Sequence, residues 1–397
     1  MKTRLTFLLL LLAINFRMAV SQESPLVEVY LLTCGPGTET YSVYGHSALR
    51  IVIPEKNSDL VYNWGVFDFN TPNFAWKFAK GRLNYSLGIS TYDNFLRDYF
   101  LEKRWVASQK LNLEPNEIER LFGLIAENLK PENITYRYDF FYDDCSTRIR
   151  DLIEKSVGDN LLWPPEEETR NMPTFRQLTG KYEEVFPWTK VGIDLLMGSP
   201  GDKKASFRDR MFLPVEMKDG LSELQIRREG KTIPLLANPV LVLDSDQPAS
   251  GKNLFTTPFF VFCVVLIIMI MLTGFFREKK SNSIIDITVF SIFSILAMMM
   301  IFFNFFTDHQ QMKWNLNIIW LNPFIILCLV SLVLKKEWQI WFRVVFFMAA
   351  GFLVSLMVLP QSINNAFVPL IGILILRSSV RANFSWNPLT IPYLTQL

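Results

Sequence analysis

Two residues of this sequence combine a reactive side chain with a position that favours covalent chemistry, Cys145 and His46. Cys145 follows Asp143 and Asp144, which are candidate caps for a helix with one apolar face. His46 precedes residues 48–53, whose apolar and β-branched side chains predict a strand. A helix amino terminus can lower a thiol pKa from about 8.5 toward about 3.5–7.5, and the thiolate is the nucleophile. The pattern indicates nucleophilic catalysis by a cysteine with a histidine base.

Charges near the cysteine oppose this chemistry, so the cysteine needs partners. Asp143 and Asp144 disfavour the thiolate by like-charge repulsion, which a histidine, and Arg148 one turn along, would offset. A third residue should orient the imidazole, and Asn63 and Asp68 on the next strand are the candidates. A strand-borne histidine facing a cysteine at a helix start is the arrangement of papain-like enzymes, here in the order of circularly permuted members.

The remaining cysteines and the small number of histidines bear on the alternatives to a catalytic cysteine, which are a disulfide and a metal site. Cys34 and Cys145 are the cysteines outside apolar segments, and in an oxidising compartment such a pair can form a disulfide. Cys263 and Cys328 lie within apolar segments, where cysteine serves as a small hydrophobic side chain. With only 2 histidines and no clustered cysteines, the sequence lacks the usual ligands of a metal site. No metal and no cofactor is expected.

The amino end has the features of a secretory signal peptide. Lys2 and Arg4 precede the apolar residues 5–14, and a small-residue site ends at Ser21, so residues 1–21 are the predicted signal. The alternative is an uncleaved anchor, although the apolar run is shorter than the roughly 20 residues that a spanning helix needs. In either case the following chain lies outside the cytoplasm.

Composition divides the rest of the chain into two domains. Residues 22–252 mix charged and apolar side chains, and they predict an extracytoplasmic domain that ends in a polar linker at 244–252. Residues 253–397 are rich in Phe, Ile, Leu and Met and predict a bundle of about five transmembrane helices. The apolar stretches are 258–276, 284–306, 318–334, 344–359 and 367–376.

Basic residues predict how these helices are oriented, because lysine and arginine gather on the cytoplasmic side of short loops. The opposite loops carry only Lys313. Basic residues follow alternate stretches, at Arg277, Lys279, Lys280, Lys335, Lys336, Arg343, Arg377 and Arg381. The outer loops therefore lie on the side of the exported domain, and the expected location is the inner membrane. A formal net charge of +2 without a basic patch argues against a nucleic-acid partner.

Local patterns predict an α+β fold for the exported domain. Residues 115–129 space their apolar side chains as a helix does and end before Pro131. Strands are predicted at 27–32, 48–53 and 60–69, and a hairpin around Glu229 and Gly230 at 223–228 and 232–243.

Four motifs resemble those of a known family. They are LLTCGPG at 31–37, YGHSALR at 44–50, YNWGVFD at 62–68 and YDFFYDDCSTR at 138–148. With the stretch around His309, they resemble the Lnb-type lipoprotein N-acyltransferases of Bacteroidota over nearly the whole chain. The resemblance implies a permuted papain-like, NlpC/P60-like periplasmic domain with His46 and Cys145 as the catalytic pair. It also implies transfer of a fatty acyl group from a phospholipid to the amino terminus of a diacylglyceryl lipoprotein.

Polar residues near the outer ends of the membrane helices form a second candidate site. They are His309, Asn315, Asn317 and Asn322. Because polar side chains at membrane depth are costly, they predict a lipid or lipoprotein site. The alternative is that they satisfy backbone groups at helix ends.

Three classes of function remain open. A thiol acyltransferase would use the membrane helices to reach a lipid donor. A related cysteine peptidase or amidase acting on cell-wall peptide would gain little from them. The third class is a non-enzymatic membrane protein stapled by a disulfide between Cys34 and Cys145.

Overall fold

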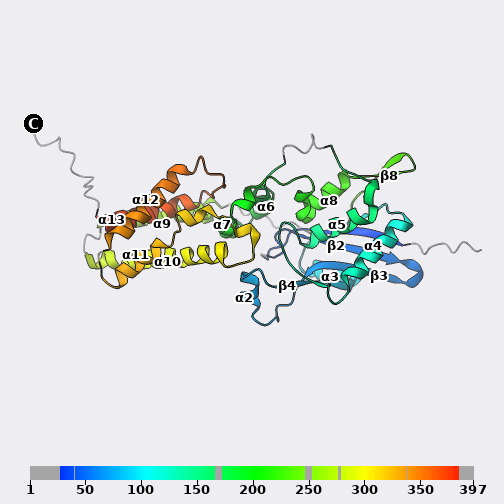
Figure 1. Cartoon of the computed structure of the whole chain (residues 1–397), viewed down its shortest axis with the longest axis horizontal. Coiled ribbons are helices and arrows are strands. Elements are labelled where there is room, and N and C mark those ends of the chain that lie inside the picture. The colour runs from blue at the N-terminus through cyan, green and yellow to red at the C-terminus, as the bar shows by residue number, and fades with distance from the viewer. Residues whose placement is uncertain are drawn as a thin grey trace, which may run out of the picture.

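The computed structural model describes residues 27–39, 41–165, 172–245, 253–275, 279–336 and 338–383. The predicted signal peptide at 1–21 and most of the predicted linker at 244–252 lie outside the described residues. The described chain forms an α+β part up to residue 245 and a helical part from residue 253, placed end to end (Figure 1). The predicted α+β class of the first part and the helical class of the second are confirmed.

An antiparallel seven-stranded sheet organises the first part, in the order β10-β5-β1-β2-β3-β4-β6. Its strands are β1 (Glu28–Cys34), β2 (His46–Ile53), β3 (Ser58–Val66), β4 (Asn84–Thr91), β5 (Val106–Lys110), β6 (Thr135–Arg137) and β10 (Val240–Leu243). A second, small sheet contains β7 (Leu161–Leu162), β8 (Gln225–Arg228) and β9 (Lys231–Pro234). Because β1 and β2 are antiparallel neighbours, Cys34 lies opposite His46 at one end of the large sheet.

Helices lie between the strands of the first part. They are α2 (Phe74–Ala79), α3 (Tyr92–Leu101), α4 (Pro115–Asn128), α5 (Cys145–Val157), α6 (Phe175–Glu183), α7 (Pro187–Leu196) and α8 (Pro214–Glu223). The helix predicted at 115–129 is confirmed as α4, which begins behind a capping box of Glu114 and Glu117. The second predicted helix is α5, and it begins at Cys145 with Asp144 as its N-cap.

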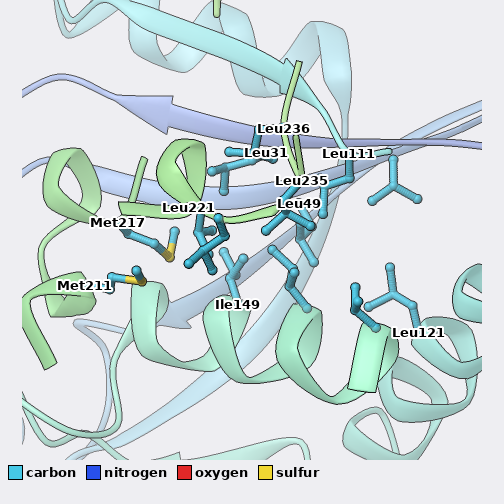
Figure 2. Close-up of a cluster of buried hydrophobic side chains, with 14 of the residues drawn as sticks. Leu31, Leu49, Leu111, Leu121, Ile149, Met211, Met217, Leu221, Leu235 and Leu236 are labelled. Carbon is cyan, nitrogen blue, oxygen red and sulfur yellow. The ribbon is translucent and has the colours of Figure 1, made fainter. Parts of the chain in front are cut away.

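Alternation along the central strands builds a core on each face of the sheet. Leu31 and Leu49 pack with Ile149 of α5 (Figure 2). On the other face, Ala48 packs with Phe95 of α3. Odd-numbered positions of β1 and β2 therefore face α5, and even-numbered positions face α3.

The hairpin predicted around residue 229 is confirmed at its turn, where Glu229 and Gly230 have φ angles of 43° and 79°. The prediction that its second strand continues to residue 243 is wrong. Leu235 and Leu236 are both buried, so successive side chains do not alternate there between core and solvent. The chain leaves β9 at this point, and β10 joins the large sheet beside β5.

The second part is a bundle of apolar helices. They are α9 (Pro258–Phe275), α10 (Lys279–Phe305), α11 (Phe324–Val333), α12 (Gln339–Ser355) and α13 (Phe367–Ala382), and each overlaps one predicted apolar stretch. In the described chain, 3 segments are long and apolar enough to cross a membrane, Pro258–Phe275, Ser283–Phe305 and Leu316–Val333, and Gln339–Ser355 is a shorter apolar helix.

A buried ion pair ties three helices of the bundle together. Asp286 of α10 and Arg377 of α13 are both fully buried, with a nitrogen–oxygen distance of 2.5 Å. Arg377 also donates to the hydroxyl of Thr273 on α9 at 2.6 Å, and Arg381 pairs with the second oxygen of Asp286. The carboxylate thus pairs with the buried Arg377 and with Arg381, whose side chain is partly exposed.

Replacing Asp286 with alanine should unfold or strongly destabilise the bundle, because the buried guanidinium of Arg377 would lose its carboxylate partner. Breaking a buried pair in this way typically costs about 3–5 kcal/mol. The measurement is the thermal midpoint of the purified protein in detergent. Asp308→Ala is the control, since Asp308 forms an exposed ion pair with Arg82. Equal thermal midpoints for the two variants would show that the buried ion pair of Asp286 does not stabilise the bundle.

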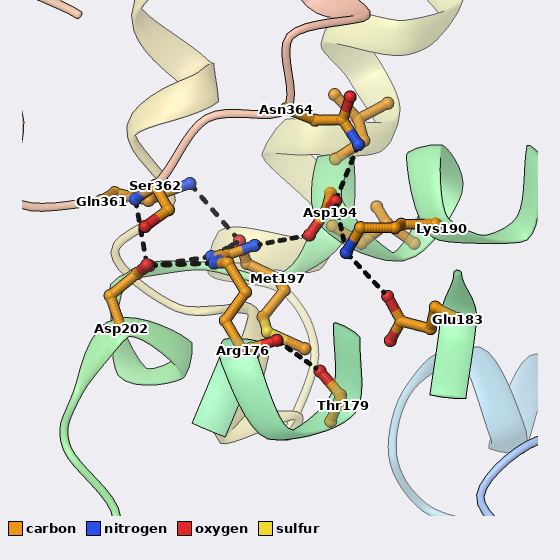
Figure 3. A network of polar contacts seen from close by, with 12 residues as sticks. Arg176, Thr179, Glu183, Lys190, Asp194, Met197, Asp202, Gln361, Ser362 and Asn364 are labelled. Carbon is orange, nitrogen blue, oxygen red and sulfur yellow. Dashed lines mark hydrogen bonds and ion pairs between the residues drawn. The ribbon is translucent and has the colours of Figure 1, made fainter. Parts of the chain in front are cut away.

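A buried polar network joins the two parts of the molecule (Figure 3). Arg176 of α6 lies between Asp194 of α7 and Asp202, at nitrogen–oxygen distances of 3.2 and 2.9 Å. From the loop before α13, the amide of Asn364 donates to Asp194 at 2.8 Å, and the backbone N–H of Ser362 donates to Asp202 at 2.9 Å. These paired charges hold the outer loops of the bundle against α6 and α7.

Candidate active site

Cys145 occupies the first position of α5, where the sequence predicted it. The carboxylate of Asp144 accepts the backbone N–H of Thr147 at 2.7 Å, and the hydroxyl of Thr147 accepts the backbone N–H of Asp144 at 2.7 Å. This capping box starts the helix and holds the Asp144 side chain away from other partners. Burial raises the pKa of Asp144 well above its usual range, and it also raises the pKa of the Cys145 thiol.

Hydrogen-bond donors surround the sulfur of Cys145 and oppose that rise in pKa. The backbone N–H groups of Ser47 and Ser146 point at it, and the Ser146 hydroxyl lies 3.8 Å from it. The hydroxyls of Ser47 and Ser146 are 3.1 Å apart, which joins β2 to the start of α5. Ser47 follows His46, so the backbone at the start of β2 lies against the start of α5.

His46 begins β2 and is held by two neighbours. Its Nε2 lies 3.3 Å from Oδ1 of Asn63, and its ring stacks on Tyr99 with the centroids 6.5 Å apart. Burial, and then the positive charge of Arg104, lower the pKa of His46 to about 4. The imidazole is therefore neutral near pH 7, as a general base must be.

Of the two candidates for orienting the imidazole, the structure brings only Asn63 to it. The strand predicted at 60–69 ends at Val66, so Asp68 lies beyond β3. Asp68 is exposed there, and its carboxylate accepts the backbone N–H of Asn70 at 2.8 Å. It caps its own turn rather than the histidine.

In the described structure no hydrogen bond joins the imidazole of His46 to Cys145. The contacts of the imidazole lie toward α3, whereas the thiol lies at the start of α5 on the other face of the sheet. Catalytic hydrogen bonds often form only when substrate is bound. In this structure the two side chains are not paired, and the imidazole would have to turn toward α5 to reach the thiol.

Glycines permit the close approach of these elements. Gly45 has φ +88°, and a Cβ there would lie 2.6 Å from the carbonyl oxygen of Cys34. Gly65 of β3 also has φ +88°, and a Cβ there would lie 3.6 Å from Cβ of Cys145. A side chain at either position would strain the backbone beside the histidine or the thiol.

Cys34 and Cys145 are both free thiols, so the alternative of a disulfide between them is wrong. Cys34 is an even-numbered residue of β1 and packs with Ala48 under α3, while Cys145 belongs to the core that faces α5. The sheet thus separates their side chains. Burial raises the pKa of Cys34 to about 12, which makes it a poor nucleophile.

Tyr136 is a candidate site residue that the sequence did not single out. Its side chain is buried, and its hydroxyl has no hydrogen-bond partner among the described atoms. Both this hydroxyl and the Cβ of Cys145 lie within 4 Å of the point where a Cβ of Gly65 would stand. Arg148, predicted to favour the thiolate, instead pairs with Asp143 at 2.5 Å and covers the Tyr136 ring at 3.4 Å. A three-residue strand with one tyrosine carries no signal that could have identified it.

The polar residues predicted for a lipid site contact the first part of the molecule. Nε2 of His309 lies 2.9 Å from the carbonyl oxygen of Phe78. The amide of Asn315 donates to the carbonyl of Leu195 at 2.8 Å, and that of Asn317 donates to the same oxygen at 3.4 Å. These contacts brace the loop between α10 and α11 against α2 and α7.

Two further amides of that region bear on the candidate site. The amide of Asn322 donates to the carbonyl of Ile319 at 3.0 Å, and its buried Oδ1 has no partner among the described atoms. The amide of Gln311 donates to the carboxylate of Asp139 at 2.5 Å. Asp139 shapes the turn before Cys145 by accepting the backbone N–H of Phe141 at 3.0 Å. The outer loop of the bundle therefore supports the segment that leads into α5.

Metal ligands are not gathered anywhere in the described chain, which contains no cluster of three or more His, Cys, Asp or Glu side chains suited to an ion. The chemistry available at Cys145 is that of a thiol, a neutral imidazole and several N–H and O–H donors. Such a set can form and break an acyl-enzyme.

Comparison with known proteins agrees with this two-part architecture. The model of the Lnb N-terminal periplasmic domain matches residues 19–180, which include His46 and Cys145, and the model of the Lnb transmembrane domain matches residues 250–385. No curated protein and no solved structure matches the chain significantly. The matched domains make this a membrane protein with an extracytoplasmic domain. The chain belongs to the Lnb family.

Proposed function

We propose that this protein is a lipoprotein N-acyltransferase of the inner membrane, with a permuted papain-like catalytic domain in the periplasm. It would move a fatty acyl group from a membrane phospholipid, through a thioester on Cys145, to the terminal α-amine of a diacylglyceryl lipoprotein. The observation that carries the proposal is a thiol at a helix start that is supported by a loop of the membrane bundle, in a domain whose neutral histidine begins the neighbouring strand β2.

In the first half of the cycle, the thiol of Cys145 attacks an ester carbonyl of the phospholipid, and His46 takes the thiol proton. Since Oδ1 of Asn63 can only accept, Nε2 of His46 carries the proton in their contact, and Nδ1 is the free base. The C–O bond of the ester then breaks. The leaving alkoxide takes the proton from the imidazolium, which releases a lysophospholipid and leaves a neutral thioester.

In the second half, the lipoprotein α-amine attacks the thioester carbonyl and gives a proton to His46. The C–S bond breaks, the sulfur regains that proton, and an amide is released. No external oxidant or cofactor is needed, because each half exchanges one acyl bond for another. A thioester suits this sequence because its sulfur leaves readily once an amine has added.

Negative charge on the carbonyl oxygen must be stabilised in both halves. The buried hydroxyl of Tyr136 lies near Cys145 and has no partner among the described residues, so it can donate to that oxygen together with backbone N–H groups at the start of α5. Tyr136→Phe keeps the ring under Arg148 and removes only the donor. We expect kcat to fall about 10²–10³-fold, the usual loss for one oxyanion donor. Tyr62→Phe is the control, because Tyr62 packs against the core that faces α5 and belongs to no proposed site. An equal loss of kcat in both variants would show that Tyr136 is not an oxyanion donor.

The direct test follows a labelled acyl chain through both halves of the cycle. The full-length protein in nanodiscs receives phosphatidylethanolamine with isotopically labelled acyl chains, and peptide mass spectrometry then seeks a hydroxylamine-sensitive adduct on Cys145. A synthetic diacylglyceryl lipopeptide is added next, and the label should move to its amine. Absence of the adduct together with cleavage of cell-wall peptide would overturn the proposal in favour of a peptidase.

A further inference from the structure

We propose that a band of aromatic side chains guides the acyl chain of the donor phospholipid from the outer face of the membrane to Cys145. We call it the aromatic track, and it consists of Phe67, Phe69, Phe74, Trp76, Phe78 and Tyr85. The inference rests on the proposed function, and it assigns the surface by which that function reaches its lipid.

The outer end of the track is attached to a membrane-spanning helix. Trp76 of α2 lies 5.5 Å from Phe302 of α10, measured between ring centroids. The backbone N–H of Asp308, just after α10, donates to the carbonyl of Lys80 at 2.9 Å. In Figure 1, α2 accordingly lies at the junction between the sheet and the outer end of the bundle. The track therefore starts at the level where the outer leaflet meets water.

Ring contacts lead from Phe74 of α2 toward the catalytic strands, whereas Trp76, two residues along the helix, points from another side of it toward Phe302. The centroids of Phe74 and Phe67 are 5.9 Å apart, and those of Phe67 and Tyr85 are 5.4 Å apart. Tyr85 of β4 then lies 4.6 Å from Tyr138. These spacings are those of packed aromatic pairs, so the rings from Phe74 to Tyr138 form one continuous series.

The inner end of the track leads through Tyr138 to the position of Cys145. The ring of Tyr138 lies within 4 Å of the point where a Cβ of Gly65 would stand, and Cβ of Cys145 lies at 3.6 Å from the same point. Gly65 thus leaves a side-chain-free position between the last ring and the nucleophile. A chain lying along the rings would present its ester carbonyl at this position.

Much of the track is exposed although it is apolar. Phe69 is 65% exposed, Trp76 59% and Phe78 52%. A contiguous exposed apolar surface of this kind marks a site of interaction with a lipid or protein. Lys77 and Lys80 alternate with the aromatic residues of α2, and Nζ of Lys80 lies 5.2 Å from the Trp76 ring. Aromatic and basic residues in alternation are typical of segments that lie in the headgroup layer.

The chemistry selects the phospholipid donor as the occupant rather than the lipoprotein acceptor. The donor must bring a carbonyl carbon to the sulfur, and that carbon is joined directly to the acyl chain that the track would hold. The acceptor contributes only an amine, which can approach the thioester without its own acyl chains following the track.

Photolabelling of the full-length protein in nanodiscs tests the inference. The probe is a phosphatidylcholine with a diazirine in one acyl chain, and crosslinks are mapped by peptide mass spectrometry. We expect them in residues 67–78 as well as on the lipid-facing helices. Two variants should weaken the track, Trp76→Ser and the double variant Phe69→Ser, Phe78→Ser. In each, labelling of residues 67–78 should fall about tenfold. The rate of Cys145 acylation by bilayer phospholipid, relative to the rate with a short-chain soluble ester, should also fall about tenfold, or about 1.4 kcal/mol.

Trp188→Ser is the matched control, because Trp188 is 49% exposed and also lies 5.5 Å from a phenylalanine of a membrane helix, Phe262. It lies on α7, away from the track, and should change neither readout. Crosslinks confined to α9–α13, an equal loss in the control, or labelling of 67–78 by a diacylglyceryl lipopeptide probe alone would overturn the inference. Labelling of 67–78 without any thioester on Cys145 would support the track as a lipid surface while refuting the proposed acyl transfer.

Discussion

Replacing Cys145 with alanine should abolish both the acyl-enzyme and the N-acylated lipoprotein, with a loss of more than about 10⁴-fold in rate, as for other nucleophiles of acyl transfer. No neighbouring group in the described site can take its place. The hydroxyl of Ser146 is bonded to that of Ser47, and Cys34 lies across the sheet with its pKa raised to about 12. The measurement is the mass of amino-terminal lipopeptides from a reporter lipoprotein in a strain that depends on this protein.

Cys34→Ala is the matched control for that variant. Cys34 is buried like Cys145 and is also a free thiol, but it faces α3. Removing its sulfur should leave the reporter acylated. If both variants lost acylation to the same degree while remaining folded, Cys145 would be a structural residue rather than the nucleophile.

Replacing His46 with glutamine should lower the rate by about 10²–10⁴-fold, the usual contribution of a general base, and should change the pH profile. The neutral imidazole is the active form. Because the pKa of His46 is lowered to about 4, the wild-type rate should fall only as the pH drops toward 4, and not near 6.5. Without the base, the rate should follow the thiolate fraction and rise about tenfold per pH unit toward the raised pKa of Cys145.

The other histidine provides the control for this experiment. His309→Gln leaves His46 and Asn63 in contact, so its profile should keep the acidic limb near pH 4. Acylation of Cys145 by a soluble ester, measured from pH 3.5 to 9, reports the limb directly. Two results would show that His46 is not the base. One is a wild-type acylation rate that already falls near pH 6.5, and the other is a pH dependence of the rate in His46→Gln that is parallel to that of the wild type.

Local signals in the sequence were sufficient for the elements that carry the candidate pair. The Asp144 cap and the helical spacing after it predicted α5 with Cys145 at its start, and β2 begins at His46, just ahead of the predicted strand. Apolar stretches and loop charges predicted the bundle and the side on which its outer loops lie. These features depend on interactions between residues within one helical turn or one strand, so a short segment of sequence is enough to predict them.

The neighbours of the pair were decided by tertiary structure. The irregular pairing of β3 with β4 between Asn63 and Val66 ends the strand before Asp68 and leaves Asn63 at the imidazole. The side of the sheet that each residue faces separates Cys34 from Cys145 and excludes their disulfide. Each outcome depends on strand register across the sheet, which short-range patterns do not encode.

By itself, the sequence determined the class of each part, the helix that starts at Cys145 and the strand that follows His46, because caps and periodicity act locally. Only the tertiary structure decided that Ser47 reaches the sulfur and that Gln311 of the bundle supports the segment before Cys145. It also decided that the Tyr136 hydroxyl lies near Cys145 with no partner in the part of the chain that the structure describes. Those contacts join segments far apart in the chain. They form only when the sheet, α5 and the outer loops pack together, so their geometry follows from the packed fold.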